Sequence, residues 1–204
     1  MQEEIINAVT HDKKDCLVLM PTGGGKSLCY QVPALLLPGI TIVVSPLIAL
    51  MKDQVDALKL NGVNAAYLNS SQDSFTQDQI IRELLRGDVK LLYIAPERLN
   101  TTSADFFAFL KQLNISLFAI DEAHCISHWG HDFRPDYLTL SKLKSEFPGV
   151  PVIALTATAD ELTRRDILER LHLENAKVFI SSFNRANIRY SVEDKVDQDR
   201  KSVV

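Results

Sequence analysis

A glycine-rich loop is the first part of this sequence whose residue types can perform chemistry. Glycines let backbone N–H groups close around an anion, a lysine reaches the β- and γ-phosphates of a nucleotide, and a serine hydroxyl ligates Mg²⁺. An apolar run precedes the loop and a helical pattern follows it, as a phosphate-binding loop requires. The residues predicted to bind the nucleotide here are Thr22, Gly23, Gly24, Gly25, Lys26 and Ser27.

Two carboxylates follow a second apolar run. Asp121 and Glu122 come directly after Ile120, so we expect them at the carboxyl end of a buried strand, beside the glycine loop. There Asp121 would hold Mg²⁺ together with Ser27, and Glu122 would polarise an attacking water. An Asp-Glu pair after a strand is by itself more often a solvated turn. The upstream glycine loop favours the catalytic interpretation, in which Lys26, Asp121 and Glu122 hydrolyse a nucleoside triphosphate.

The elements that must position these residues alternate between apolar strands and amphipathic helices. Near-continuous apolar strands separated by helices predict a doubly wound α/β domain, with a mostly parallel sheet covered by helices on both faces. Gly62 and Gly87 are expected to end helices, and Pro33 to kink or restart one. The expected strands are 15–20, 40–44, 89–95, 115–120, 150–155 and 177–181. The expected helices are 2–10, 26–37, 46–60, 77–86, 103–113, 136–147 and 160–171.

Composition narrows the function classes. With 22 basic and 26 acidic residues the net charge is −4, which argues against a protein that coats nucleic acid by bulk electrostatics but allows a local binding groove. No apolar run approaches the roughly 18 residues of a membrane helix, so no membrane contact is expected, and the location is expected to be cytoplasmic. Cys16, Cys29 and Cys125 are few and far apart, so disulfides are not expected.

The chain is expected to be a fragment of a longer protein. The sequence starts in what looks like a helix, and a strand pattern that begins at Arg189 has no partner before a polar end. We therefore expect residues 1–184 to form one nucleotide-binding domain that is truncated at its N-terminus. Residues 185–204 are expected to be an interdomain segment with a stub of the next domain.

An aromatic-rich segment follows the carboxylates. Trp129 is the single tryptophan, and His128, Phe133 and Arg134 lie close to it in the sequence. An exposed aromatic side chain can stack on any base, and an arginine can pair with a phosphate. From composition alone, a buried Trp and Phe that pin the loop to the core is the more common arrangement. The flanking glycine, proline and charges favour a mobile loop.

A metal site is an alternative for the same segment. Cys125, His128 and His131 form a C-x-x-H-x-x-H string, whose residue types ligate zinc. Structural zinc sites usually have four ligands, with a longer loop between two pairs, so this string is a weak zinc signal. His11 and His172 are isolated and are expected on the surface.

Five segments together resemble the first motor domain of the RecQ family of DNA helicases, bacterial type. They match in order and spacing over almost the whole chain, and Met20 fits that family's version of the glycine loop. The segments are residues 20–31, 45–54, 93–99, 121–127 and 154–159.

The resemblance implies a RecA-like P-loop NTPase fold with ATP and Mg²⁺ as cofactors. It further implies 3′-to-5′ movement along single-stranded DNA, unwinding of partially duplex DNA, and a role in recombination and repair on the bacterial nucleoid. A second RecA-like domain of the same parent chain would supply an arginine finger. A single-strand-binding protein is implied as a further partner.

The resemblance also implies roles for individual residues. Gln2 stands where such helicases place an adenine-reading glutamine, but the aromatic and arginine residues expected before it are missing, so adenine recognition is expected to be impaired. His124, Thr156 and Thr158 would link the γ-phosphate state to the grip on DNA, although both threonines could equally cap the next helix. The implied DNA-binding or coupling residues are Ser45, Arg98, His124, His128, Trp129, Phe133, Arg134, Thr156 and Thr158.

Two alternatives from other classes remain. The same glycine loop and Asp-Glu-Ala-His string occur in RNA-remodelling ATPases of the DEAH type, and the aromatic-rich segment is the feature that favours DNA. Stimulation of ATP hydrolysis by DNA or by RNA would decide between them. The second alternative is a domain that holds nucleotide but neither hydrolyses it nor moves, which would apply to this chain taken alone.

Overall fold

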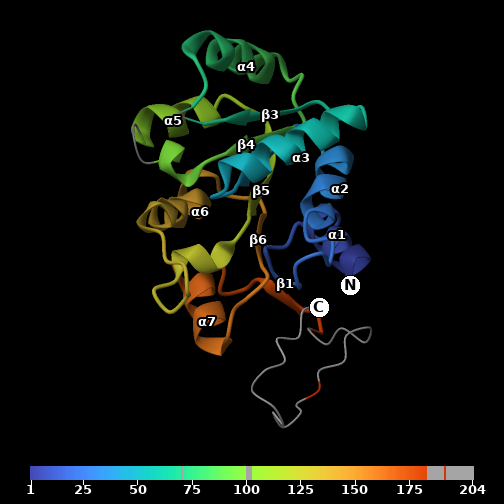
Figure 1. Ribbon diagram of the computed structural model, residues 1–204, viewed down its shortest axis with the longest axis vertical. Helices are drawn as coiled ribbons and strands as arrows, with labels where there is room; N and C mark the ends of the chain where they lie inside the picture. Colours follow the sequence, from blue (N-terminus) through green and yellow to red (C-terminus); the bar gives the residue numbers. More distant parts are fainter. Residues whose placement is uncertain (70, 100–102, 183–190, 192–204) are drawn as a thin grey trace, which may run out of the picture.

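A parallel sheet lies between two layers of helices in the computed structural model, which describes residues 1–69, 71–99, 103–182 and 191 (Figure 1). The sheet has seven strands in the order β3-β4-β2-β5-β6-β1-β7, and each pair of neighbours is parallel. The strands are β1 (Cys16–Leu19), β2 (Ile40–Val44), β3 (Ala65–Leu68), β4 (Leu91–Ile94), β5 (Ile115–Ile120), β6 (Val152–Thr156) and β7 (Lys177–Ile180).

The helices divide between the two faces of the sheet. Helices α1 to α3 contribute to one hydrophobic core, and α4 to α7 contribute to the core on the opposite face. The α-helices are α1 (Gln2–Thr10), α2 (Leu28–Leu36), α3 (Ile48–Leu60), α4 (Ser74–Arg86), α5 (Ser103–Leu110), α6 (Leu143–Glu146) and α7 (Glu161–Arg170). Three 3₁₀ helices add η1 (Pro96–Leu99), η2 (Ala123–Ile126) and η3 (Pro135–Lys142).

Strand β1 shows why the strands are apolar throughout. Its alternate side chains Leu17 and Leu19 pack into one core, while Cys16 and Val18 pack into the other. Because both faces are covered, every residue of the strand is buried. The same two-sided burial explains the continuous apolar runs that predicted β2 and β5.

The structure confirms six expected strands and corrects two details. Strand β3 was not predicted, and the expected helix 136–147 is instead the 3₁₀ helix η3 followed by the single turn α6. Helix α2 continues through Pro33, so the helix does not restart there, and the expected kink stays a prediction. Gly87, in contrast, ends α4 as expected, with a left-handed φ of 76° that suits a residue without a Cβ atom.

The expected domain of residues 1–184 stays a prediction; the described fold runs through β7 and on to residue 182. The expected interdomain segment 185–204, including the strand expected from Arg189, lies outside the described residues except for Ser191. Cys16, Cys29 and Cys125 are buried free thiols, as predicted. Among the described residues, no helix has the length and apolar character needed to cross a membrane.

Candidate active site

The predicted chemical residues meet at the carboxyl edge of the sheet, where β1, β2 and β5 end. A cavity of about 240 Å³ opens there. It brings the glycine loop that follows β1 together with the two carboxylates that follow β5, although these segments are far apart in the sequence. The lining residues are Thr22, Gly23, Gly25, Lys26, Ser27, Tyr30, Ser45, Leu50, Met51, Gln54, Tyr93, Asp121 and Glu122.

The glycine loop is a tight turn between β1 and α2. Gly24 N–H donates to the carbonyl of Pro21 at 2.9 Å, and Gly23 and Gly25 adopt φ values of 77° and 80°. Left-handed backbone of this kind is accessible to glycine at little cost. A Cβ atom on Gly25 would also come within 2.3 Å of Nε2 of Gln2. Helix α2 then begins directly after Ser27, so its first N–H groups lie next to the loop.

Gln2 holds the loop from behind. Its side-chain amide Nε2 donates to the carbonyls of Gly24 and Gly25, at 3.1 and 3.3 Å. Gln2 is not among the residues that line the cavity. Its expected contact with adenine stays a prediction, and the structure adds a second role for it as a support of the loop.

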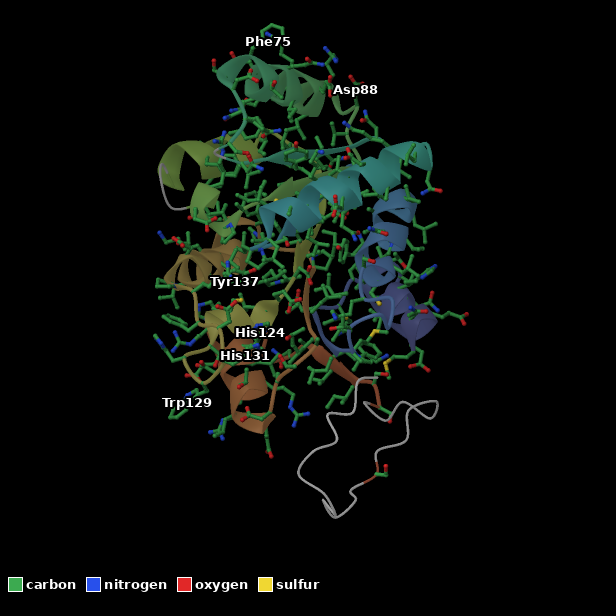
Figure 2. The ribbon with its side chains drawn as sticks, viewed as in Figure 1. Phe75, Asp88, His124, Trp129, His131 and Tyr137 are labelled. Atoms are coloured by element: carbon green, nitrogen blue, oxygen red, sulfur yellow. The ribbon has the colours of Figure 1, made fainter. Side chains whose placement is uncertain are left out.

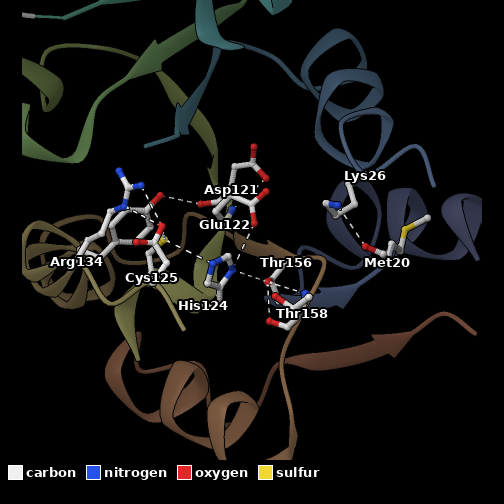
Figure 3. A network of polar contacts seen from close by, with 11 residues as sticks. Met20, Lys26, Asp121, Glu122, His124, Cys125, Arg134, Thr156 and Thr158 are labelled. Atoms are coloured by element: carbon white, nitrogen blue, oxygen red, sulfur yellow. Dashed lines mark hydrogen bonds and ion pairs between the residues drawn. The ribbon is translucent and has the colours of Figure 1, made fainter. Parts of the chain in front are cut away.

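The Lys26 side chain lines the cavity and contacts the start of the glycine loop. Its Nζ donates to the carbonyl of Met20 at 3.2 Å, the residue that follows β1 (Figure 3). No side-chain acceptor in the described residues is paired with this ammonium group in a salt bridge. A single backbone carbonyl is a weak partner for a charged group, so an anion in the cavity would compete for it.

Asp121 and Glu122 form a constrained turn at the end of β5. Glu122 has a φ of 47°, which is unusual for a residue with a side chain, and its N–H donates to Oδ1 of Asp121 at 3.0 Å. Burial, and secondarily the negative charge of Glu122, raises the pKa of Asp121 to about 6, while Lys26 opposes this shift. The pocket therefore concentrates negative charge that a cation would relieve.

A histidine connects the second carboxylate to β6. Nδ1 of His124 lies 2.9 Å from Oγ1 of Thr156 and 3.3 Å from Oε2 of Glu122 (Figure 3). The Thr156 hydroxyl donates to the carbonyl of Thr158 at 3.1 Å and accepts from its N–H at 3.2 Å. Both groups facing Nδ1 are therefore acceptors, so the proton of the ring lies on Nδ1.

The protonation state of His124 follows from its surroundings. Burial lowers its pKa, and the nearby charge of Glu122 only partly offsets this effect. At neutral pH the imidazole is therefore uncharged and donates one proton toward Thr156 and Glu122. The predicted link between His124, Thr156 and Thr158 thus has a continuous set of contacts, and its role in coupling stays a prediction.

The aromatic-rich segment, residues 128–134, is a projecting segment at the surface of the molecule. Trp129 is 69% exposed and lies at the opposite end of the molecule from Phe75 (Figure 2). Phe133 is half-buried, with its ring centroid 3.8 Å from that of His128. The alternative in which a buried tryptophan pins this loop is therefore wrong for Trp129. The exposed indole is available for stacking on a base.

Arg134 ends the projecting segment and is already engaged. Its guanidinium pairs with Oδ2 of Asp132 at 3.0 Å and donates to the carbonyl of Pro46 at 3.4 Å. Its backbone N–H donates to the carbonyl of Cys125 at 2.8 Å. These contacts join the segment to the loop after β2 and to η2.

The zinc alternative finds no support in the placement of its residues. His131 stacks on His124 with ring centroids 4.5 Å apart, whereas His128 packs on Phe133. Within the described residues, the potential ligand atoms that do gather belong to His124, Cys125 and Asp132. Burial raises the pKa of the Cys125 thiol to about 12, which favours the protonated form rather than a metal-binding thiolate.

Two predicted DNA-contacting residues lie in unexpected surroundings. Ser45 is 2% exposed and lines the cavity, so its side chain is buried beside the carboxylates rather than on the surface. The guanidinium of Arg98 donates to Oε1 of Gln77 at 2.7 Å and lies over the ring of Phe106. The DNA contacts expected of Arg98 and of the backbone at Ser45 stay predictions. His11 and His172 are exposed, as expected.

Sequence reasoning missed Tyr137. This tyrosine is fully buried in η3, and its hydroxyl donates to the backbone carbonyl of Asp121 at 2.9 Å. In the sequence it belonged to a helical apolar pattern and was therefore part of an ordinary core face. Only the polar tip of the ring could have drawn attention to it, because a buried tyrosine hydroxyl usually has a partner.

The comparison with protein families decides the classification. The sequence model of the DEAD/DEAH box helicase family matches residues 1–166. The chain belongs to the DEAD/DEAH box helicases. The phosphate-loop and Asp-Glu-Ala-His segments both lie within the matched region.

Within this family, the chain is similar to RecQ helicases. It is 57% identical over 194 residues to the ATP-dependent DNA helicase RecQ of Pasteurella multocida, covering 95% of this chain and 30% of that protein. It is 48% identical over 200 residues to the RecQ of Bacillus subtilis, covering 98% of this chain and 34% of that protein. The chain thus spans about a third of the length of these curated relatives. The predicted RecQ-type motor domain is confirmed.

Solved helicase structures share the fold of this DEAD/DEAH box domain. The Hef helicase domain of Pyrococcus furiosus matches with a TM-score of 0.66 at 17% identity, over 90% of this chain and 38% of that chain. The DUF1998 helicase MrfA bound to DNA matches with a TM-score of 0.66 at 18% identity, over 88% of this chain and 25% of that chain. The predicted RecA-like α/β fold is confirmed.

Proposed function

We propose that this chain is the ATP-hydrolysing motor domain of a DNA helicase that moves 3′ to 5′ along single-stranded DNA. The observation that carries the proposal is the cavity that gathers Lys26, Ser27, Asp121 and Glu122 from two distant segments. The names of the similar RecQ proteins support ATP and DNA as the substrates.

The cavity fits a magnesium nucleotide. The Ser27 hydroxyl and the Asp121 carboxylate offer the hard oxygen ligands that Mg²⁺ prefers. Burial, and secondarily the charge of Glu122, raises the pKa of Asp121, so a bound cation would stabilise its charged form. Bound Mg²⁺ would neutralise charge on the β- and γ-phosphates. Lys26 would exchange its contact with the Met20 carbonyl for these phosphates, while the glycine loop would supply N–H donors.

Glu122 is the proposed general base. Its carboxylate lines the cavity and is oriented by the Nδ1–H of His124. A carboxylate within reach of a water can accept its proton as the water attacks the γ-phosphate. Nδ1 of His124 contacts both Glu122 and Thr156. A movement of Glu122 when the γ-phosphate is cleaved would therefore alter the contact of His124 with Thr156 at the end of β6.

DNA would bind at the projecting segment. The exposed Trp129 offers a surface on which a nucleobase can stack. Arg134 anchors the C-terminal end of this segment through its contacts with the Pro46 carbonyl and the Asp132 carboxylate. The proposed partners are single-stranded and partially duplex DNA, a second RecA-like domain of the parent chain that supplies an arginine finger, and a single-strand-binding protein. We place the protein in the cytoplasm, on the nucleoid, with recombination and repair as its processes.

ATP turnover by the full-length protein tests this proposal. We expect turnover to rise with single-stranded DNA and to rise much less with RNA of the same sequence. Glu122→Gln should retain binding of Mg²⁺-ATP and lose about 10²–10⁴-fold in turnover, because an amide cannot accept the proton. Equal stimulation by RNA would favour the RNA-remodelling alternative. Nucleotide binding without turnover under all conditions would favour the binding-module alternative.

A further inference from the structure

The turn that carries the proposed base is held in an unusual backbone conformation. Glu122 is one of three residues other than glycine with a positive φ in the described part of the chain, and its value is 47°. Left-handed backbone at a residue with a side chain is unfavourable and persists only where the surroundings impose it. The direction of the Glu122 carboxylate depends on this conformation, because the side chain turns with its own backbone.

The peptide group between Asp121 and Glu122 is fixed from both sides. On one side, the N–H of Glu122 donates to Oδ1 of Asp121 at 3.0 Å. On the other side, the carbonyl of Asp121 accepts from the Tyr137 hydroxyl at 2.9 Å. A peptide plane held at both its N–H and its C=O cannot rotate without losing one hydrogen bond. Because Tyr137 is fully buried, water would not replace the lost donor there.

Tyr137 is also tied to the projecting segment. It lies in η3, which begins directly after Arg134, and its backbone N–H donates to the Arg134 carbonyl at 3.0 Å. Burial raises the pKa of the phenol well above its ordinary value, so the hydroxyl remains a donor at all physiological pH values.

We infer that Tyr137 is a positioning residue for ATP hydrolysis: through its hydrogen bond to the Asp121 carbonyl it holds Glu122 in the orientation that activates water, and it connects this orientation to the DNA-binding segment. The inference rests on the function proposed above. It adds a backbone route from Arg134 to the general base, separate from the side-chain route through His124 and Thr156.

Tyr137→Phe in the full-length protein tests the inference, since it removes the hydroxyl and keeps the ring that packs in the core. We expect kcat for DNA-stimulated ATP hydrolysis to fall about tenfold, because small misplacements of a catalytic group are costly. KM for ATP and the Kd for DNA should stay within about twofold of the original, since neither ligand touches this hydroxyl.

Two comparisons separate positioning from a general loss of stability. In a Glu122→Gln background, Tyr137→Phe should lower turnover no further, because the base that it positions is gone. Asp73→Ala is the matched control, since it removes the N-terminal cap of α4 near the far edge of the sheet. It should lower Tm without lowering kcat.

Each result is decisive. Original kcat in Tyr137→Phe would overturn the inference, as would an equal further loss in the Glu122→Gln background, or a matching loss of kcat in Asp73→Ala. Failure of the proposed function would look different, because the unmodified protein would then show no turnover that DNA stimulates.

Discussion

At the scale of single residues, Lys26 is placed so that its loss would affect chemistry and leave folding intact. Its ammonium group lines the cavity and donates to one backbone carbonyl, while its neighbours Gly25 and Ser27 are fixed by the turn and by α2. Without Lys26, the loop would have no side-chain cation to offset the charge on the β- and γ-phosphates. We therefore expect the lysine to contribute to nucleotide binding far more than to packing.

We predict that Lys26→Ala abolishes ATP turnover in the full-length protein and leaves Tm within a few degrees of the original. Turnover with single-stranded DNA and a thermal melt measure the two effects. Lys59→Ala, which removes an exposed lysine from the last turn of α3, is the control and should retain turnover. Original turnover in Lys26→Ala would rule out the phosphate-loop assignment.

Burial of the Asp121 carboxylate lowers the stability of the folded protein at pH values where this group is charged. Burial raises its pKa from 3.8 to about 6, so between these pH values the folded protein binds more protons than the unfolded chain. The free energy of unfolding therefore falls as the pH rises through this window, and the full cost is present above pH 6. Mg²⁺ would offset this cost by pairing with the carboxylate.

We predict that Asp121→Asn raises the free energy of unfolding at pH 8, without Mg²⁺, by about 1–3 kcal/mol. The amide oxygen can still accept from the Glu122 N–H, while the buried charge is gone. The gain should be smaller at pH 5, where the native carboxyl is largely protonated. Denaturant unfolding in EDTA at both pH values measures it, and an equal gain at pH 5 and pH 8 would contradict the assigned cause.

At the scale of elements, the sequence predicted six strands, including the largely exposed edge strand β7, and missed the edge strand β3. Strands β1, β2 and β5 are continuous apolar runs, whereas β3 is the short edge strand Ala65–Leu68, in which Tyr67 is only half-buried. Two alanines and an edge position give little β signal. The 3₁₀ geometry of η3 was also missed, because apolar spacing does not distinguish i+3 from i+4 hydrogen bonds over two turns.

The candidate site was predictable to different depths. The glycine loop and the two carboxylates could be found because binding a phosphate and a metal ion requires those residue types directly after a strand. The surroundings of Ser45 and Arg98 could not, since the burial of one and the Gln77 partner of the other depend on how distant elements pack. The Tyr137 contact with Asp121 likewise needs the path of η3 across the end of β5.

The projecting segment gives a prediction at this scale. Trp129→Ala should leave Tm unchanged and reduce the stimulation of ATP turnover by DNA, because the indole is exposed and a stacked base contributes about 1–3 kcal/mol. Phe75→Ala is the matched control, since it removes a 72% exposed aromatic ring at the other end of the molecule (Figure 2). It should preserve both Tm and stimulation. A large drop in Tm for Trp129→Ala, with stimulation intact, would show that the indole is part of the core.

At the scale of the whole molecule, the two helical layers leave one edge of the sheet for function. The phosphate loop, the carboxylates and the His124–Thr156 contact all lie where strands end, and the projecting segment extends from the same edge. Because every neighbouring pair of strands is parallel, the carboxyl ends of the strands all lie at the same edge of the sheet. The body of the sheet can therefore stay rigid while the loops at this edge respond to ligands.

The cavity in this domain lacks one group that fast phosphoryl transfer commonly uses. Within the described residues, no arginine lines it, and Arg134 is paired with Asp132. An arginine finger contributes about 10³–10⁵ in rate where it is present. We predict that the 204-residue chain alone folds, binds ATP weakly, hydrolyses it far more slowly than the full-length protein, and separates no DNA strands.

Circular dichroism, nucleotide titration and turnover with single-stranded DNA, run side by side on both proteins, measure these outcomes. DNA-stimulated turnover by the 204-residue chain equal to that of the full-length protein would contradict a site shared between two domains. Arg134 would then be the first arginine to replace, since it needs only to leave Asp132 and Pro46 to change partners.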